Sequence, residues 1–494
     1  MIRDYTVQFF ESKFNGAEQP INESLFIYDH ECISEEESIL MDVVPSVEEI
    51  RRAVYDLGVD SAPGPDGFSG CFYRHCWDII HQDLINAITY CWQHKLIPQG
   101  SNSSLLIFLV KVRGVNTLRN FRPIGLSNFF FKIFTKILAT RLGGVLDKLV
   151  SEEQVTFMKG RNIHENISVA SEMVNELKCK RKDGNVGLKL NISQAFDTGN
   201  MKSLNNLLSL LGKYQAASGQ TVCRLKSKVY YGGNSMSRCR TITDLLGMEV
   251  STFPDRYLVV KIMPGVVKYC HICNVIDKIK KQLAVWKGRL LSFQDRMVLI
   301  NSVIAIYLIH NRVFYKWPRK FIDQCERAIH SFLWSGDSDV RRKFVVAYDK
   351  VCCPMKEGGL GISKLVVTNK ALLMKLWWNI QSSKKKWARF LYAKYTTRKG
   401  KIKKYGVNYS IHPGIKQIYK IVDSNTKVLL GDGRSNSLYF DIWYGYTSIA
   451  EIIGEDGLDC SVKVSDFLIN NEWVIPDAHL HNLLRAGVIL NNFP

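Results

Sequence analysis

The sequence lacks the long apolar runs that mark export or membrane insertion. The first residues, MIRDYTVQFFESKFNG, carry charges where a signal peptide needs an unbroken apolar stretch. The most apolar segment, VLINSVIAIYLIH at 298–310, contains Asn301 and Ser302 and is too short to span a bilayer. We therefore expect an intracellular protein, in the nucleus or the cytoplasm, with no membrane partner.

Cysteine is present, but without the spacing of a disulfide framework. The 13 cysteines are an odd number and are scattered along the chain, which favours reduced thiols in a reducing compartment. The one Cys-x-x-Cys pair, Cys270 and Cys273, has no second pair at zinc-finger distance. Core or surface thiols explain these two residues better than a metal site does.

Acidic residues are few relative to basic ones. The 494 residues include 66 Lys and Arg against 46 Asp and Glu, which gives a formal net charge of +20. A surplus of this size is typical of proteins that bind RNA or DNA, or less often an anionic membrane, although many solvated surfaces are simply rich in Lys. The composition is otherwise globular, and the chain is long enough for two to four domains.

Helical periodicity predominates along the chain. Ser46 is a predicted N-cap, and apolar residues recur at helical spacing after it and again between 275 and 335. SSLLIFLVKV (103–112) predicts a strand, NFRPIGL a turn before a long helix, and DGNVGLKLNISQAFD (183–197) a turn, a strand and a second turn. The sequence therefore predicts an α+β fold that is mostly helical.

The strongest purely physical indication of nucleic-acid binding is KKKWARFLYAKYTTRKGKIKK at 384–404. It holds ten Lys and Arg residues and no acidic residue, with Trp387, Phe390, Tyr392 and Tyr395 among them. Cations interleaved with rings are typical of single-strand binding surfaces. Helical spacing equally allows the rings to form a buried stripe while the Lys side chains face water. The candidate binding residues are Lys384, Lys385, Lys386, Lys401, Lys403 and Lys404.

Five motifs, in order, carry a resemblance to a known family. They are SAPGPDGF, FLVK, FRPIGL, QVTFMKGRNIHENI and LKLNISQAFD, and segments such as SGQTVCRLKSKVYYGG, FLWSG and NKALLMKLWW continue the series downstream. Each motif alone is a weak signal, but five in family order are specific. On these residues the chain resembles the reverse transcriptase of plant LINE-type (non-LTR) retrotransposons, from about residue 45 onward.

The resemblance implies RNA-directed DNA synthesis assisted by two Mg²⁺ ions, which carboxylates hold while cations neutralise the triphosphate. By motif position, Lys111 and Arg122 bind the phosphates of the incoming nucleotide. Arg161, in GRNIHENI, is a candidate contact to the nucleic-acid backbone. From spacing alone, other interpretations remain open: a strand-end Lys for Lys111, a turn Arg for Arg122 and a surface salt-bridge Arg for Arg161.

The first catalytic motif departs from the family pattern Lys-Leu-Asp-Leu-Ser-Lys-Ala-Tyr-Asp. Residues 189–197 read KLNISQAFD, so Asn191 replaces the metal-binding Asp. Phe196 keeps the aromatic position that packs beneath the nucleotide sugar, and Asp197 keeps the last position. A neutral amide offers one oxygen, whereas Mg²⁺ is bound mostly through carboxylates and phosphates. Asp197 does not obviously replace the missing carboxylate, because it lies six residues further on, across a turn.

The second departure is larger, because the sequence contains no adjacent Asp–Asp pair. In the family such a pair, on a hairpin, supplies the remaining metal-binding carboxylates. SGQ at 218–220 matches a segment beyond that hairpin, and only 20 residues separate it from Asp197. This is too few for several strands and a helix. We therefore predict a deletion within the palm, no intact metal site, and no Mg²⁺ bound by this copy.

These inferences combine into one prediction. The chain is a degenerate, internally deleted reverse transcriptase, a pseudoenzyme with fingers, a truncated palm, thumb-like helices and a C-terminal extension. A non-catalytic RNA- or DNA-binding protein and an unselected retrotransposon remnant are the alternatives, and the oligomeric state is open. The predicted segments are 1–200 (fingers and start of the palm), 201–275 (palm remnant and connection), 276–345 (thumb-like), 346–405 (basic and aromatic) and 406–494 (truncated extension).

Overall fold

The computed structural model describes most of the chain. The described residues are 2–14, 31–111, 114, 117–177, 179, 184–190, 194–198, 201–218, 222–258, 260–286, 288–304, 313–339, 346–397, 400–403, 410–426, 433–434, 436–445, 447–454, 458–459, 461–469 and 472–488. They divide into two compact units, unit 1 (1–161 and 210–221) and unit 2 (162–209 and 222–494). The finer five-part division made from the sequence stays a prediction.

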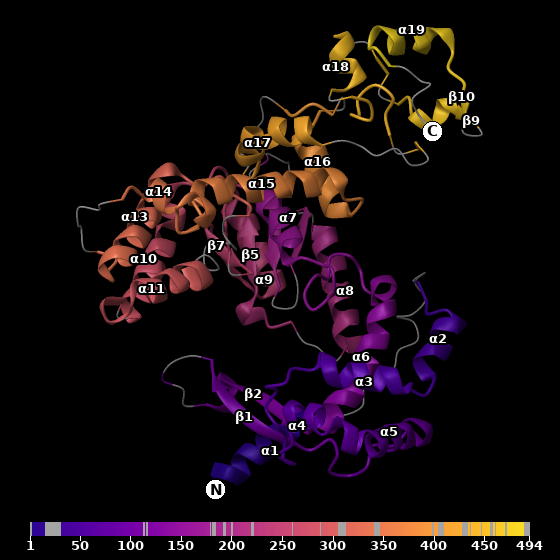
Figure 1. Cartoon of the computed structure of the whole chain (residues 1–494), viewed down its shortest axis with the longest axis vertical. Helices are drawn as coiled ribbons and strands as arrows, with labels where there is room; N and C mark the ends of the chain where they lie inside the picture. The colour runs from indigo at the N-terminus through magenta and orange to yellow at the C-terminus, as the bar shows by residue number, and fades with distance from the viewer. Residues whose placement is uncertain are drawn as a thin grey trace. The chain divides into compact units, whose positions relative to one another are not determined.

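The described part of unit 1 consists of helices and a β-hairpin (Figure 1). Its core joins α3, α5 and α6 through fully buried side chains such as Ile50, Ile88, Phe129 and Ile133. Ser46 caps α3 as predicted, because its side chain accepts the backbone N–H of Glu49. The elements are α1 (Ile2–Phe14), α2 (Glu35–Asp42), α3 (Val47–Asp56), α4 (Gly70–His75), α5 (Trp77–His94), β1 (Ser104–Val110), β2 (Phe121–Ser127) and α6 (Phe129–Leu149).

The hairpin confirms one prediction and corrects another. The strand predicted over 103–112 is β1. The turn predicted at NFRPIGL is wrong, because Phe121–Ser127 forms β2, paired antiparallel with β1 along its whole length. Pro123 and Gly125 obscured this strand in the sequence, since neither residue favours a strand and only pairing with a distant partner stabilises it.

Unit 2 contains a four-stranded sheet of order β4-β3-β5-β6, in which β5 and β6 run parallel and the other pairs antiparallel. The turn predicted after the strand in 183–197 is wrong for Gln194–Thr198, which forms β4 beside β3, whereas residues 191–193 lie outside the described residues. The elements up to this point are α7 (Ile163–Glu176), β3 (Asn185–Lys189), β4 (Gln194–Thr198), α8 (Met201–Ser218, shared with unit 1), β5 (Lys228–Tyr231), α9 (Met236–Leu246), β6 (Glu249–Val250), β7 (Asp255–Tyr257) and β8 (Val260–Ile262).

The remainder of unit 2 is mainly helical and holds the largest core, which includes Phe314, Tyr315, Phe332 and Trp377. A smaller core around Leu438 and Trp443 organises the C-terminal part. No described helix is both long enough and apolar enough to cross a membrane. The elements are α10 (Tyr269–Val285), α11 (Phe293–Leu299), α13 (Arg319–Ser335), α14 (Tyr348–Val351), α15 (Leu365–Ser382), α16 (Lys386–Tyr395), α17 (His412–Asn425), α18 (Ile449–Ile453), β9 (Leu468–Ile469), β10 (Glu472–Trp473) and α19 (Asp477–Arg485).

Candidate functional site

The β1–β2 hairpin brings the two candidate phosphate-binding cations onto one face. Arg122 lies directly opposite Leu109, and the backbone N–H of Lys111 donates to the carbonyl of Asn120 at 2.9 Å, which continues the ladder by one residue. Residues two apart in a strand share a face, so Lys111 and Arg122 are diagonal neighbours, roughly 7–8 Å apart. Both side chains are exposed. Such a pair is suited to bind a polyanion.

The Pro63–Gly67 turn is fixed to the base of this hairpin by Asn128, whose importance the sequence did not reveal. The Asn128 side chain accepts the N–H of Asp66 at 3.2 Å and donates to the carbonyl of Gly100 at 3.1 Å. A Cβ on Gly64 would lie 2.3 Å from the backbone nitrogen of Asn128, so this close approach requires glycine. The turn therefore has a clear structural role.

Arg161 has internal partners. Its guanidinium donates to the carboxylate of Asp147 at 3.0 Å and to the carbonyls of Val150, Ser151 and Gln154. Only 7% of the side chain is exposed. These contacts close the C-terminal end of α6, and we do not include Arg161 in the proposed interface.

The structure describes only part of the predicted catalytic motif at 189–197. Asn191 lies outside the described residues. The backbones of Phe196 and Asp197 belong to β4, where Phe196 pairs with Gly187 and Asp197 pairs with Val186 of β3. The positions of their side chains are not described.

The sheet carries a charged cluster that the sequence did not predict. Lys189 on β3 lies directly opposite Lys228 on β5. The carboxylate of Asp255 accepts hydrogen bonds from Lys189 at 2.9 Å, from Lys228 at 3.0 Å and from the Tyr230 hydroxyl. Burial alone would raise the pKa of Asp255, but these three donors outweigh it and hold the pKa of this carboxyl well below its usual range. Two like charges on adjacent strands are thus bridged by one carboxylate.

We expect Asp255→Asn to lower the free energy of unfolding by about 2 kcal/mol at pH 7, because it leaves the two ammonium groups without their shared anion. A carboxyl whose folded-state pKa is lowered stabilises the fold above its unfolded-state pKa, and that contribution is lost as the pH falls toward the lowered value. The difference from wild type should therefore narrow below about pH 4. Urea unfolding between pH 3 and pH 7 measures it.

The matched control for this cluster is Asp349→Asn. Asp349 forms an ion pair with Lys364 at 2.7 Å, but 74% of its side chain is exposed. Exposed pairs contribute about 0–1 kcal/mol, so this variant should differ little from wild type at any of these pH values. A loss as large as that of Asp255→Asn would contradict the special role of the cluster.

The residues present do not fit a site for two Mg²⁺ ions. The predicted first ligand position is Asn191, and no Asp–Asp pair occurs in the sequence. Among the described residues there is no group of three His, Cys, Asp or Glu side chains that could hold a metal ion, and this includes the surroundings of Cys270 and Cys273. The carboxylate that does lie against β3 and β5, Asp255, is already bound by three protein donors.

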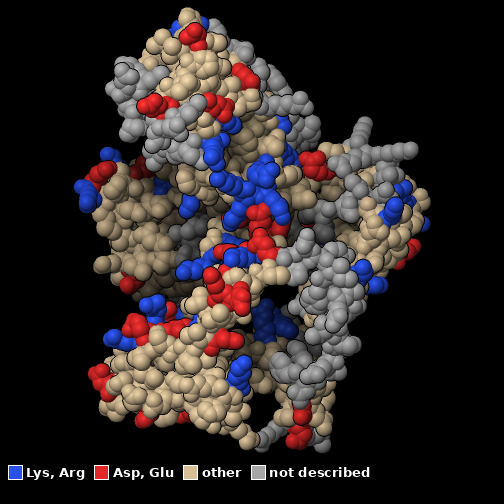
Figure 2. All heavy atoms as spheres, turned by 90° about the vertical axis from the view of Figure 1, so that its right-hand side faces the viewer, with Lys and Arg blue, Asp and Glu red and all other residues tan. Residues whose placement is uncertain are grey.

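Some cations of the basic segment at 384–404 form ion pairs with acidic residues of the same unit. The ammonium of Lys385 lies 3.3 Å from the carboxylate of Glu165. Lys394, only 8% exposed, binds Glu176 at 2.7 Å and lies 3.6 Å from Glu172. Figure 2 shows a face on which Lys and Arg side chains gather with Asp and Glu side chains among them. Acidic residues of α7 thus neutralise part of the segment.

The remaining candidates differ in exposure. Lys384, Lys386 and Lys401 are exposed. The Lys403 ammonium donates to the carbonyls of Ala393 and Lys394 at the end of α16. Lys404 lies outside the described residues.

Some aromatic rings of α16 are buried, as the buried-stripe interpretation predicts, and others are exposed, as a nucleic-acid-binding surface requires. Tyr395 is fully buried and Trp387 packs against the core, as the buried-stripe interpretation requires. Phe390 and Tyr392 remain 37% and 36% exposed. Phe390 lies beside Lys394, whose ammonium is 5.7 Å from the ring centroid.

Residues 110–215 match the protein family described as reverse transcriptase (RNA-dependent DNA polymerase). This span includes Lys111, Arg122 and the predicted catalytic motif. The described part of the chain mixes many helices with small sheets, in keeping with the predicted α+β class.

The chain is also similar to three curated proteins. A putative ribonuclease H protein of Arabidopsis thaliana is 24% identical over 39% of this chain and 32% of its own length. The transposon TX1 uncharacterized 149 kDa protein of Xenopus laevis is 23% identical over 73% of this chain and 35% of its own length. A retrovirus-related Pol polyprotein from type-1 retrotransposable element R2 of Nasonia vitripennis is 28% identical over 34% of this chain and 15% of its own length.

These similarities identify a reverse transcriptase-like protein. It is of the kind found in non-LTR retrotransposons, as the motifs predicted. The chain spans about a third of the length of the first two relatives and less of the third.

Proposed function

We propose that this chain is a catalytically defective reverse transcriptase of the plant LINE type that keeps an affinity for RNA or DNA. The observation that carries the proposal is the loss of the metal-binding carboxylates, with Asn191 at the first position and no Asp–Asp pair in the sequence. Charge neutralisation by metal ions dominates phosphoryl transfer, and losing shared negative ligands removes several kcal/mol of transition-state stabilisation.

The pairing of strands in the sheet of unit 2 is compatible with the predicted deletion. β5 follows the SGQ segment and pairs directly with β3, through Leu188 opposite Val229 and Lys189 opposite Lys228. The edge of β3 that faces β5 is therefore filled without the strands of an Asp–Asp hairpin. The Asp255 cluster then offsets the repulsion between the two Lys residues that this pairing places side by side.

In this proposal the five predicted segments are fingers with the start of a palm, palm remnant, thumb-like helices, basic helical region and C-terminal extension. Lys111 and Arg122 keep the positions that bound the nucleotide phosphates in the ancestral enzyme. Their placement on one exposed face of the hairpin supports that ancestry.

Primer extension tests the defect. With the purified chain, an RNA template, a DNA primer and either Mg²⁺ or Mn²⁺, we expect no templated product, because the ligands for two metal ions are missing. Asn191→Asp should also give none, since it restores one carboxylate and not the pair. An active reverse transcriptase in parallel and a cooperative unfolding transition of the test protein are the controls. A templated product from wild type would overturn the proposal.

Genomic DNA between the codons for Asp197 and Ser218 tests the deletion independently. We expect no reading frame for an Asp–Asp hairpin in this interval. An intact hairpin there would show that exons had been joined across a gap, and would leave Asn191 as the remaining defect.

Nucleic-acid binding by the 384–404 segment is a separate part of the proposal. The test variant changes Lys384, Lys386 and Arg389 to Gln, because all three side chains are exposed. It keeps Lys385, which forms an ion pair with Glu165. The triple Gln variant should bind single-stranded RNA more weakly and lower the slope of log K against log salt by about 2. Fluorescence anisotropy at several salt concentrations measures both quantities.

The matched control neutralises Lys213, Lys350 and Lys356, which are also exposed but lie on other elements. This variant has the same net charge as the test variant. Equal losses of affinity in the two would mean that only overall charge matters. A wild-type affinity that does not change with salt would exclude a phosphate-based interface.

A further inference from the structure

The motif NKALLMKLWW ends in two tryptophans that the fold treats differently. Trp377 is 1% exposed, and its indole N–H donates to the carboxylate of Asp423 at 2.9 Å. Trp378, the next residue of α15, is 50% exposed. The first is a core residue, whereas burial does not explain the second.

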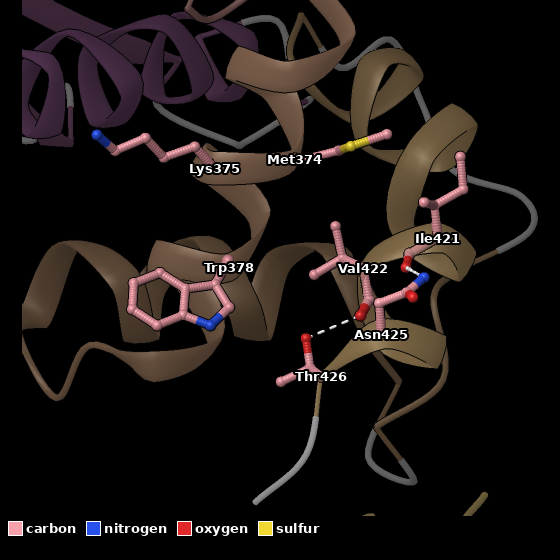
Figure 3. Close-up of a pocket in the computed structure, with 7 residues that line it drawn as sticks. All are labelled: Met374, Lys375, Trp378, Ile421, Val422, Asn425 and Thr426. Carbon is pink, nitrogen blue, oxygen red and sulfur yellow. Dashed lines mark hydrogen bonds between the residues drawn. The ribbon is translucent and has the colours of Figure 1, made fainter. Parts of the chain in front are cut away.

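Trp378 forms one wall of a pocket of about 370 Å³ between α15 and α17 (Figure 3). Met374 and Val422 line it with apolar atoms, and Ile421 adds an apolar side chain that is 48% exposed. α15 and α17 pack directly on one another, so both sides of the pocket belong to one packed helical pair. Lys375 also lines the pocket.

Two polar side chains at the pocket already form hydrogen bonds to the backbone of α17. Thr426 donates its hydroxyl to the carbonyl of Val422 at 2.8 Å, and the Asn425 amide donates to the carbonyl of Ile421 at 2.8 Å. The lining therefore offers a flat ring and apolar contacts rather than a set of hydrogen bonds that would read one particular ligand.

The charge around the pocket favours an anionic partner. α15 contains Lys370 and Lys375 and no acidic residue, and the exposed Lys384 follows its C-terminal end. The acidic residue of α17, Asp423, accepts hydrogen bonds from Trp377 and from Gln381. An exposed ring beside cations is the combination that single-stranded nucleic acid uses, because every base offers a face for stacking.

We infer that Trp378 is a stacking platform for a base of single-stranded RNA or DNA, with Lys375 and Lys384 beside the backbone phosphates. This inference rests on the proposed nucleic-acid binding and adds to it a second contact region, on α15. It also explains why the side chain after the buried Trp377 is again a tryptophan, since the indole offers the largest stacking surface.

Anisotropy titrations with a labelled 12-nucleotide RNA test the platform. Trp378→Ala should weaken binding by roughly 5- to 150-fold, the range that stacking of one base covers, and Trp378→Phe should recover most of the loss. The salt slope should stay unchanged, because the indole carries no charge. Binding to a blunt RNA duplex should be the same for all three proteins, since paired bases are not free to stack. Tyr90→Ala, which removes another ring that is 50% exposed, is the matched control.

The outcomes distinguish a failure of the Trp378 platform from a failure of nucleic-acid binding as a whole. If wild type binds no nucleic acid, the proposed binding function fails. If wild type binds and Trp378→Ala binds equally well, the platform is wrong while nucleic-acid binding stands, and the pocket then suits an apolar side chain of a protein partner. Cross-linking with 5-iodouracil RNA should place the adduct on the peptide that contains Trp378, and an adduct confined to other peptides would also overturn the inference.

Discussion

Glu172→Ala should lower the free energy of unfolding of unit 2 by about 3–5 kcal/mol. Glu172 lies on α7 with its side chain fully buried. Its carboxylate accepts the backbone N–H groups of Ser410 at 3.1 Å and Ile411 at 2.8 Å, and it lies 3.6 Å from the ammonium of Lys394. Alanine would leave two buried N–H donors without an acceptor, each at a cost of about 1–3 kcal/mol.

Two further variants separate burial from charge. Glu172→Gln keeps an oxygen acceptor at the same place, so it should cost about 1–2 kcal/mol. Glu176→Ala also removes a partner of Lys394, but this carboxylate is 44% exposed and its loss should cost less than about 1 kcal/mol. Urea unfolding followed by tryptophan fluorescence suits the measurement, because only Trp77 and Trp92 of the ten tryptophans lie outside unit 2. A Glu172→Ala protein as stable as wild type would contradict this account.

The pH dependence of the Gln variant gives a second test. Burial raises the pKa of Glu172, although the N–H of Ile411 and the Lys394 ammonium act in the opposite direction. When a carboxyl has a higher pKa in the folded state than in the unfolded state, ionisation favours the unfolded state. The free energy of unfolding therefore falls as the pH rises through the ordinary pKa range of Glu. The stability advantage of wild type over Glu172→Gln should therefore shrink as the pH rises above about 4.

This buried network also shapes the candidate interface. Lys394 belongs to the basic segment by sequence, yet it joins α16 to α7 through Glu172 and Glu176. Glu172 in turn holds the backbone at 410–411, just before α17. Figure 1 shows α15, α16 and α17 close together in orange, and α15, which carries Trp378, packs against both α16 and α17. The free energy of unfolding should therefore be measured for every binding variant, and the affinity for RNA for every stability variant.

Local sequence signals predicted the parts of the fold that depend on local interactions. The N-cap of Ser46 and the apolar run of β1 are properties of adjacent residues, and both predictions are confirmed. The strands β2 and β4 were predicted as turns, because each is stabilised by pairing with another strand rather than by its own composition. Family motifs, rather than physical pattern, selected Lys111 and Arg122, and the register of the hairpin then placed them together.

The charged clusters could not be predicted in this way. Asp255 meets Lys189 across 66 residues, and Glu172 meets Ile411 across 239. No periodicity connects positions so far apart, and a run such as KKKWARFLYAK gives no sign of which Lys residues will find a carboxylate. The sequence therefore indicated a basic surface, whereas the contacts show which of its cations are already engaged.

Gly336→Ala should lower the free energy of unfolding by about 2–5 kcal/mol, through two separate effects. Gly336 follows α13 with φ +73, a left-handed conformation that disfavours any side chain by about 1–2 kcal/mol. A Cβ there would also lie 2.5 Å from the backbone nitrogen of Arg289 and 2.5 Å from the carbonyl carbon of Gly288. Backbone atoms cannot turn away as a flexible side chain does, so the two segments would have to separate.

Gly358→Ala isolates the first effect. Gly358 has φ +82, but a Cβ there meets no atom within 4 Å. Its substitution should cost only about 1–2 kcal/mol, and the entropy that alanine removes from the unfolded chain is the same in both variants. Urea unfolding of the two proteins should thus differ by about 1–3 kcal/mol, the cost of overpacking. Equal losses would show that the backbone relaxes without cost. Gly336 ends FLWSG, one of the segments that carry the family resemblance. An additional loss in Gly336→Ala would therefore attribute the resemblance at this glycine to the packing of one backbone against another rather than to contact with nucleic acid.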